Sequence, residues 1–387
     1  MSKEDSFMEF SLSKRHLLLR DLYRKFAEEE VKPLAEELDE QERFPVETVK
    51  KLAKYGFMGI PFPKEYGGSG ADNLAYSMAV EELGKVCATT AVIVSAHTSL
   101  CCQPIFQFGT EEQKKKYLVP LAKGEKLGAF GLTEPSAGTD ASMQQTKAVL
   151  DGDEYVLNGT KIFITNGEYA DTYVVVAMTD VSKGTRGISA FIVEKGTPGF
   201  SFGKKERKMG IRGSATCELV FENCRIPKEN ILGKEGQGFK IAMQTLDAGR
   251  IGIASQALGI SEGAIDECVK YVLERKQFGR KIGQFQNTQF ELADMAAKVE
   301  AVKLLVYEAA CEKDAHRPYS HLSSMAKYLA GSTASDVTRR CLQLFGGYGY
   351  TREYPIERMM RDAKITEIYE GTSEVQKIVI ANWLKLK

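Results

Sequence analysis

The sequence predicts an α+β protein made of three consecutive parts. We expect an N-terminal helical domain over residues 1–122, a middle antiparallel β-barrel or sandwich over residues 123–235, and a C-terminal four-helix bundle over residues 236–387. Three observations predict this order: apolar residues recur every three or four positions at both ends of the chain, the hydrophobic period becomes two in the middle, and glycine-containing turns separate the short middle runs. A chain of 387 residues is long enough for a sizeable core.

Composition excludes several classes of function. Lys plus Arg (52) balance Asp plus Glu (52), so there is no basic excess for nucleic acid or a membrane surface. No apolar run approaches the roughly 18 residues that span a bilayer. Eight cysteines without a C-x-x-C pair, and only four histidines, predict no metal site and a reducing compartment. The polar start at residues 1–6 has no signal-peptide core, so we expect a soluble, cytoplasmic protein.

The first third has the pattern of a helical domain. Leu18, Leu22 and Phe26 repeat every four residues and predict an opening helix. His97 lies in a small, apolar segment, and we interpret it as a satisfied core residue rather than a catalyst. Further helices are expected at residues 47–55, 74–86 and 111–119, the last ended by Pro120.

Strand signals dominate the middle of the chain. Asp151-Gly152 lies between two arms with alternating apolar residues and predicts a β-hairpin. Two β-branched or aromatic runs, 173–178 and 188–193, predict further strands. Neither the dinucleotide fingerprint G-x-G-x-x-G after a strand nor the P-loop G-x-x-x-x-G-K-[ST] is present, so a Rossmann dehydrogenase or P-loop enzyme is disfavoured.

A narrow apolar stripe predicts the core of the C-terminal bundle. Its members alternate by three and four residues, which is typical of helices that pack on one another: Leu292, Met295, Val299, Val302, Val306 and Ala309.

A carboxylate near the C-terminus, Glu370, is the candidate catalytic base. Ser373 and Gln376 have the spacing of a capping box, which predicts a helix that begins near Ser373 and buries a stripe of Val375, Ile378, Val379 and Trp383. Glu370 would therefore precede a helix N-terminus, with Gly371 leaving room for a ligand. An apolar pocket would raise its pKa and suit it to proton abstraction. The alternative reading is a solvated loop carboxylate.

Several motifs, taken in order, resemble the acyl-CoA dehydrogenase family over residues 10–384. The segments that carry the resemblance are Ile60-Pro-Phe-Pro-Lys-Glu-Tyr-Gly-Gly-Ser-Gly70, Leu132-Thr-Glu-Pro-Ser-Ala-Gly-Thr-Asp140, Phe163-Ile-Thr-Asn-Gly167, Gln343-Leu-Phe-Gly-Gly347 and Tyr369-Glu-Gly-Thr372. The resemblance implies that Glu370 removes the α-proton of an acyl-CoA thioester while the β-hydrogen leaves as hydride to FAD. It is strongest, in residues 243–259, to members that act on short, straight-chain substrates such as butyryl-CoA.

The resemblance also implies two sets of FAD-binding residues. The first set would serve the flavin of the same chain: Phe130, Leu132, Thr133, Gly138, Thr139, Phe163, Ile164, Thr165, Thr372, Ser373 and Glu374. The second would reach the FAD of a neighbouring subunit: Arg275, Gln286, Gln343, Leu344, Phe345, Gly346 and Gly347. Two departures from the family pattern lie in the first set, because Thr139 stands where serine is usual and Phe163 where tryptophan is frequent. Shared sites imply a homotetramer, a dimer of dimers.

Substrate contacts are implied for Thr139, Asp247, Arg250 and Gly371, and the electron acceptor would be an electron-transfer flavoprotein. In some relatives the base is at the position of Gly249, so a single base, Glu370, favours the straight-chain branch over the isovaleryl branch. Two alternatives remain open: an oxidase or monooxygenase of the same fold, and a non-catalytic scaffold that binds flavin or CoA.

Overall fold

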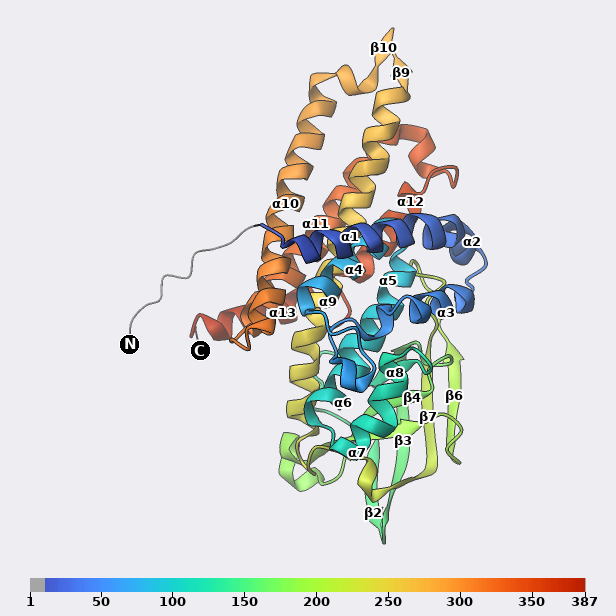
Figure 1. The fold of residues 1–387 in the computed structure, drawn as a ribbon, viewed down its shortest axis with the longest axis vertical. Helices are drawn as coiled ribbons and strands as arrows, with labels where there is room; N and C mark the ends of the chain where they lie inside the picture. Colours follow the sequence, from blue (N-terminus) through green and yellow to red (C-terminus); the bar gives the residue numbers. More distant parts are fainter. Residues whose placement is uncertain (1–10, 387) are drawn as a thin grey trace.

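The computed structural model describes residues 11–386, with helices at both ends of the chain and a sheet between them (Figure 1). The polar start at residues 1–6 lies outside the described residues. The predicted α+β class and the order of helical, β and helical parts are confirmed.

From residue 11 onward, eight α-helices form the N-terminal part. They are α1 (Lys14–Phe26), α2 (Ala35–Glu40), α3 (Val46–Lys54), α4 (Asn73–Val86), α5 (Ala88–Ser95), α6 (Gln103–Phe108), α7 (Glu111–Gln113) and α8 (Val119–Ala122). Ser13 caps α1 by accepting a hydrogen bond from the backbone N–H of His16, which satisfies one of the free donors of the first turn. The predicted opening helix is present. Of the three residues that predict it, Phe26 enters the core, whereas Leu18 and Leu22 are exposed.

The helix expected at residues 111–119 is longer than predicted. A π-helical stretch, Lys114–Leu118, joins α7 to α8, and Pro120 lies within the first turn of α8. Proline is tolerated there because the backbone N–H groups of a first turn have no intrahelical partner. The prediction that Pro120 ends this helix is therefore wrong.

The middle part is one mixed sheet of eight strands. Its strands are β1 (Gly128–Gly131), β2 (Lys147–Asp151), β3 (Glu154–Thr165), β4 (Thr172–Met178), β5 (Ile188–Glu194), β6 (Phe200–Lys205), β7 (Thr216–Pro227) and β8 (Ile231–Leu232). The order is β6-β7-β3-β2-β4-β5-β8, with β1 beside β4. Most pairs are antiparallel as expected, but β1 and β2 each pair with β4 in parallel. The predicted hairpin is present, and its turn is centred one residue later, at Gly152-Asp153.

Three long helices dominate the C-terminal part, with two shorter ones. They are α9 (Gly238–Glu274), α10 (Gln286–Asp314), α11 (Ser320–Phe345), α12 (Ile356–Ile365) and α13 (Ser373–Trp383), with the small hairpin β9 (Lys276–Gln277) and β10 (Arg280–Lys281) between α9 and α10. The predicted stripe on α10 is core: Leu292 is partly buried and the other five members are buried. The changes between helix and strand fall between α8 and β1 and between β8 and α9, and we propose domain boundaries at 122/123 and 235/236 on this basis.

His97 is a buried core residue, as the sequence predicts. Its Nδ1 accepts the N–H of Gly128 at 3.0 Å, and its Nε2 lies 3.2 Å from the carbonyl oxygen of Met58. All eight cysteines are free thiols. No group of three or more His, Cys, Asp or Glu in residues 11–386 is arranged to hold a metal ion. Over the same residues, no helix is both long enough and apolar enough to cross a bilayer.

Candidate active site

Glu370 lies on a short loop between α12 and α13 that has an unusual backbone conformation. Glu370 has φ +53° and Gly371 has φ +96°, so two successive residues are left-handed. That region is unfavourable for a residue with a side chain, and glycine adopts it freely. The hydrogen bond from the N–H of Ser373 to the carbonyl of Glu367 (3.0 Å) closes the loop. Among residues 11–386, the N–H of Glu370 donates to no backbone or side-chain acceptor.

Helix α13 begins where the sequence predicts, but its cap and its buried face differ. Thr372, not Ser373, is the N-cap, and its hydroxyl accepts the N–H of Val375. The predicted buried stripe is wrong for the single chain, because Ile378 and Trp383 are about half exposed. Gln376 is the buried residue of this helix, and its Nε2 donates to the carbonyl of Gly371 at 2.8 Å.

The carboxylate of Glu370 points inward against α9. Its Oε2 is buried and has no hydrogen-bond partner in the described part of the chain. A Cβ atom added to Gly249 would lie only 2.0 Å from this oxygen and 2.8 Å from Leu100. The carboxylate therefore occupies the space that a side chain at position 249 would need. Burial raises the pKa of Glu370 to about 8, although Lys327 and Arg250 oppose the shift.

Asp247 and Arg250 lie one turn apart on α9, beside this carboxylate. Arg250 Nη1 donates to Asp247 Oδ1 at 2.7 Å and to Ser324 Oγ at 3.3 Å. Burial raises the pKa of Asp247 and lowers that of Arg250. Arg250 is buried, with its Nε unpaired in residues 11–386, so it is not a solvated surface charge.

Hydroxyl and amide groups lie along α9 beyond Gly249. The hydroxyl of Tyr369 donates to Gln256 Oε1, and Gln256 Nε2 donates to the carbonyl of Ala88 at 2.9 Å. A Cβ added to Gly252 would lie 2.4 Å from Ser95 Oγ and 2.6 Å from Tyr76 Oη. These contacts leave little room beside α9 one to two turns from the Glu370 carboxylate.

The residues of the first FAD set in the β domain lie on β1, β3 and the loop after β1. Phe163 is 57% exposed and left-handed (φ +58°), at a register shift between β3 and β7. Phe130, Leu132 and Ile164 are buried, whereas Gly138 and Thr139 are exposed. Thr165 and Thr133 are partly exposed. Within the described residues, the N–H groups of Thr133, Gly138 and Thr139 have no protein acceptor. Thr372, Ser373 and Glu374, the rest of this set, form the start of α13.

A buried ion pair that no sequence pattern predicted connects the loop after β1 to β3. Lys161 Nζ contacts Glu134 Oε1 at 2.6 Å, Gln144 Oε1 at 2.5 Å and the carbonyl of Leu132 at 3.1 Å. Glu134 also accepts the backbone N–H groups of residues 145 and 146. The alternation of side chains along β3 places Lys161 on one face of the sheet, but no nearby sequence pattern identifies Glu134 as its partner.

The second FAD set lies far from Glu370. Arg275 follows Gly249 by 26 residues along the uninterrupted α9, which is about 39 Å at 1.5 Å per residue. Arg275 and Gln286 are exposed at the two ends of the β9–β10 segment, the upper end of the molecule in Figure 1. A single FAD is too short to contact both Glu370 and Arg275 of one chain.

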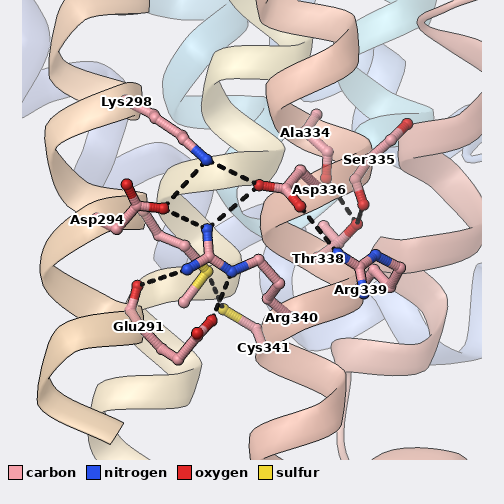
Figure 2. A network of polar contacts seen from close by, with 11 residues as sticks. Glu291, Asp294, Lys298, Ala334, Ser335, Asp336, Thr338, Arg339, Arg340 and Cys341 are labelled. Carbon is pink, nitrogen blue, oxygen red and sulfur yellow. Dashed lines mark hydrogen bonds and ion pairs between the residues drawn. The ribbon is translucent and has the colours of Figure 1, made fainter. Parts of the chain in front are cut away.

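Residues 343–347 include the last turn of α11 and the two glycines after it, in a region held by a charged network. Arg340 binds Glu291, Asp294 and Asp336, and Lys298 bridges the two aspartates (Figure 2). Gln343, Gly346 and Gly347 are exposed and Leu344 is partly so. The ring of Phe345 is stacked on Tyr271 in the bundle core at 4.1 Å.

A groove of about 690 Å³ opens beside Asp247. Helix α13 forms one wall, and the loop before α11 and the start of α11 form the other. Trp383 and His321 stack there, with ring centroids 4.5 Å apart. The lining also includes Arg317, which pairs with Glu312 outside the groove.

Three family descriptions match successive parts of the chain: acyl-CoA dehydrogenase N-terminal domain at residues 13–125, middle domain at 129–224 and C-terminal domain at 236–385. A short-chain specific acyl-CoA dehydrogenase of Clostridium acetobutylicum is 64% identical over 97% of this chain and 99% of the relative. An acryloyl-CoA reductase (NADH) of Anaerotignum propionicum is 55% identical over 97% and 95%, respectively.

Solved structures agree with this similarity. Butyryl-CoA dehydrogenase of Megasphaera elsdenii has a TM-score of 0.96 at 53% identity, covering 98% of this chain and all of that one. A structure described as the electron transferring flavoprotein of Acidaminococcus fermentans has a TM-score of 0.97 at 59% identity, covering 97% and 99%. A glutaryl-CoA dehydrogenase of Mycobacterium smegmatis in complex with FADH2 has a TM-score of 0.92 at 33% identity, covering 97% and 96%. The chain belongs to the acyl-CoA dehydrogenase family of flavin-dependent oxidoreductases.

Proposed function

We propose that this protein oxidises a short, straight-chain acyl-CoA such as butyryl-CoA to the trans-2-enoyl-CoA, with Glu370 as the base that removes the α-proton. The observation that carries this proposal is the Glu370 carboxylate packed on Gly249, whose Oε2 is buried and has no hydrogen-bond partner in residues 11–386. A carboxyl with a pKa of about 8 is matched to general-base catalysis near neutral pH.

The residues present fit an FAD. Thr133, Gly138 and Thr139 offer N–H groups with no protein acceptor in residues 11–386, and hydroxyls at 133, 139 and 165 add further hydrogen-bonding groups. The half-exposed ring of Phe163 offers a flat apolar face. FAD, when bound, supplies the acceptor for the hydride that leaves the β-carbon of the substrate.

The chain itself has to make the α-proton acidic and to receive it. The free N–H of Glu370 supports a role as hydrogen-bond donor to the thioester carbonyl, where negative charge develops as the proton leaves. Arg250 and Asp247 would orient the CoA arm, and the groove beside Asp247 offers that arm a path to the surface. Glu370 then holds the α-proton on its carboxyl.

The crowding around Gly252 and the hydrogen bond between Tyr369 and Gln256 support the short-chain preference, because they limit the depth available beyond the α-carbon. The relatives from Clostridium acetobutylicum and Megasphaera elsdenii, whose names specify short-chain acyl-CoA or butyryl-CoA, support it too. Initial rates across acyl-CoA lengths from C4 to C12 test this part, and a maximum at C8 or longer would contradict it.

We propose a homotetramer in which the second FAD set serves a neighbouring chain. The rise of about 39 Å along α9 from Gly249, which packs on Glu370, to Arg275 supports shared sites. The exposed apolar side chains of Phe278, Phe290, Ile378 and Trp383 support them too. An electron-transfer flavoprotein is the proposed electron acceptor, in keeping with the Acidaminococcus fermentans structure. Light scattering of the purified protein tests the assembly, and a monomer that retains FAD and full activity would contradict it.

Anaerobic addition of butyryl-CoA to the purified flavoprotein tests the function. We expect the flavin absorption to bleach, and Glu370→Gln to retain FAD but to reduce it at least about a thousandfold more slowly. Rapid reoxidation in air would instead indicate an oxidase of the same fold. Bound flavin that does not bleach would indicate a non-catalytic scaffold, and unchanged turnover by Glu370→Gln would remove Glu370 from the mechanism.

A further inference from the structure

One face of α11 packs against α9 and the loop that carries Glu370. Ser320, Ser324, Lys327 and Gly331 recur on this face at helical spacing. Ser320 donates to Asp247, Ser324 accepts from Arg250, and a Cβ on Gly331 would lie 2.9 Å from the carbonyl oxygen of Thr366. Lys327 lies between these contacts, in the middle of the site.

Lys327 is fully buried, at 1% exposure, and its Nζ donates to the carbonyl of Gly371 at 2.7 Å. That carbonyl already accepts a hydrogen bond from Gln376 at 2.8 Å. Burial of an ammonium group destabilises the folded protein, and one further hydrogen bond to a carbonyl that already has a donor offsets only a small part of that free energy. The hydrogen bond alone does not account for a lysine at this position.

Charge gives the lysine a second role. Of the two cations that face Glu370, Arg250 is paired with Asp247 at 2.7 Å. Lys327 makes no ion pair within 4.0 Å with any acid in residues 11–386, and Glu370 acts on it more strongly than Glu367 or Glu374 does. Its positive charge is therefore available to the base.

Two tyrosines that face the base are neutral near pH 7. Tyr76 on α4 and Tyr369 on the catalytic loop both face Glu370, and burial raises the pKa of both phenols. Burial lowers the pKa of Lys327 to about 8, while Glu370 acts in the opposite direction. Burial raises the pKa of the base most strongly, and the charges of Lys327 and Arg250 oppose that effect.

We propose that Lys327 is a positioning residue for the dehydrogenation: it holds the Gly371 carbonyl, which fixes the left-handed turn at Glu370, and its charge favours the ionised form of that base. This inference rests on the proposed role of Glu370. It assigns separate effects to the hydrogen bond and to the charge of one side chain, and two substitutions separate them.

Lys327→Gln retains a donor and removes the charge, whereas Lys327→Met removes both. The control is Lys208→Met. Lys208 is partly buried and, like Lys327, donates to a backbone carbonyl (Ser214, 2.8 Å), and burial lowers its pKa to about 8 as well. Glu370 is not among the charges that act on Lys208. The kcat/KM of each holoenzyme with butyryl-CoA is measured from pH 6 to 10.

For wild type we expect kcat/KM to rise with pH through about 8, since the ionised carboxyl is the active form. Both Lys327 variants should shift this limb upward by about one pH unit or more, which is about a tenfold loss at pH 7. Lys327→Gln should recover near pH 10, Lys327→Met should stay lower there, and Lys208→Met should keep the wild-type midpoint. Losses that are equal at every pH, or no loss, would overturn the proposal.

A second measurement does not depend on turnover. The infrared band of a protonated carboxyl reports the titration of Glu370 directly. For wild type, the Glu370 band is isolated by subtracting the spectrum of Glu370→Gln. For each Lys327 variant, it is isolated by subtracting the spectrum of the double variant that also carries Glu370→Gln. We expect its midpoint to rise in both Lys327 variants, and an unchanged midpoint would refute the electrostatic role. If wild type is not bleached by butyryl-CoA while the infrared midpoint still shifts, the proposed function fails and the coupling of Lys327 to Glu370 stands.

Discussion

The contact between Gly249 and Glu370 makes the position of the base testable. In Gly249→Ala the new Cβ would lie 2.0 Å from Glu370 Oε2, and ordinary contact begins at 3.4 Å, so the two atoms have to separate by about 1.4 Å. A displacement of about 1 Å at a reacting group costs on the order of a hundredfold in rate. We therefore expect flavin reduction by butyryl-CoA to slow about a hundredfold in stopped-flow measurements at pH 9.

Stability should change much less than rate in this variant. Alanine within a helix is favoured over glycine by about 1 kcal/mol, whereas overpacking costs about 1–3 kcal/mol. Urea unfolding should thus show a change of at most about 2 kcal/mol, which separates a displaced base from an unfolded protein.

A shorter base supplies the matched control. Glu370→Asp retracts the carboxylate by one methylene group, so it should slow the wild-type protein but relieve the contact in the Gly249→Ala background. We expect the double variant to reduce its flavin faster than Gly249→Ala alone. If Gly249→Ala stays within a factor of two of wild type, or if the effects of the two substitutions on the activation free energy are simply additive, the shared space does not control the base.

Three further substitutions test other parts of the structure by urea unfolding. Glu370→Gln should be more stable than wild type at high pH. The pKa of Glu370 is raised from 4.5 to about 8, so the carboxyl's contribution to stability is fully present below pH 4.5 and is lost as pH rises to 8, by at most about 5 kcal/mol for 3.5 pH units. A stability difference between the two proteins that does not vary with pH would contradict the raised pKa. Lys161→Met should destabilise by about 3–5 kcal/mol because Glu134 is left buried and unpaired, and Glu134→Gln in the same chain should recover part of this loss; the absence of any recovery would contradict that cause. Arg340→Met should cost about 1–3 kcal/mol, while Arg339→Met, an exposed arginine with one aspartate contact, should stay within about 0.5 kcal/mol; equal costs would show that the network in Figure 2 does not lock α10 to α11.

Local sequence signals were sufficient to predict an element where its hydrophobic period and its turn or capping residues agreed. The α10 stripe, the hairpin at Gly152 and the start of α13 at Ser373 all follow from patterns within a dozen residues. The buried His97 could be predicted because the residues around it are small and apolar. The three-part order and the family are likewise confirmed.

Contacts between distant segments could not be predicted from such patterns. Lys327 and Gly371 are 44 residues apart, and Lys161 and Glu134 are 27 apart, so no window of sequence contains either pair with its partners. The apolar residues of α13 have the period of a buried stripe, but their exposure in a single chain shows that periodicity identifies a face without identifying what covers it. Pro120 failed as a helix terminator because its effect depends on its position within the helix.

The left-handed backbone at Glu370 also bears on how related sequences are read. The conformation with φ +53° costs a residue with a side chain about 1–3 kcal/mol of strain, and it costs glycine far less. Selection for folding alone would thus favour glycine over the acid at this position, which supports the catalytic role proposed for Glu370. In a genome that carries several copies of this gene, a copy with glycine at both position 370 and position 249 is expected to encode a more stable protein without catalytic activity.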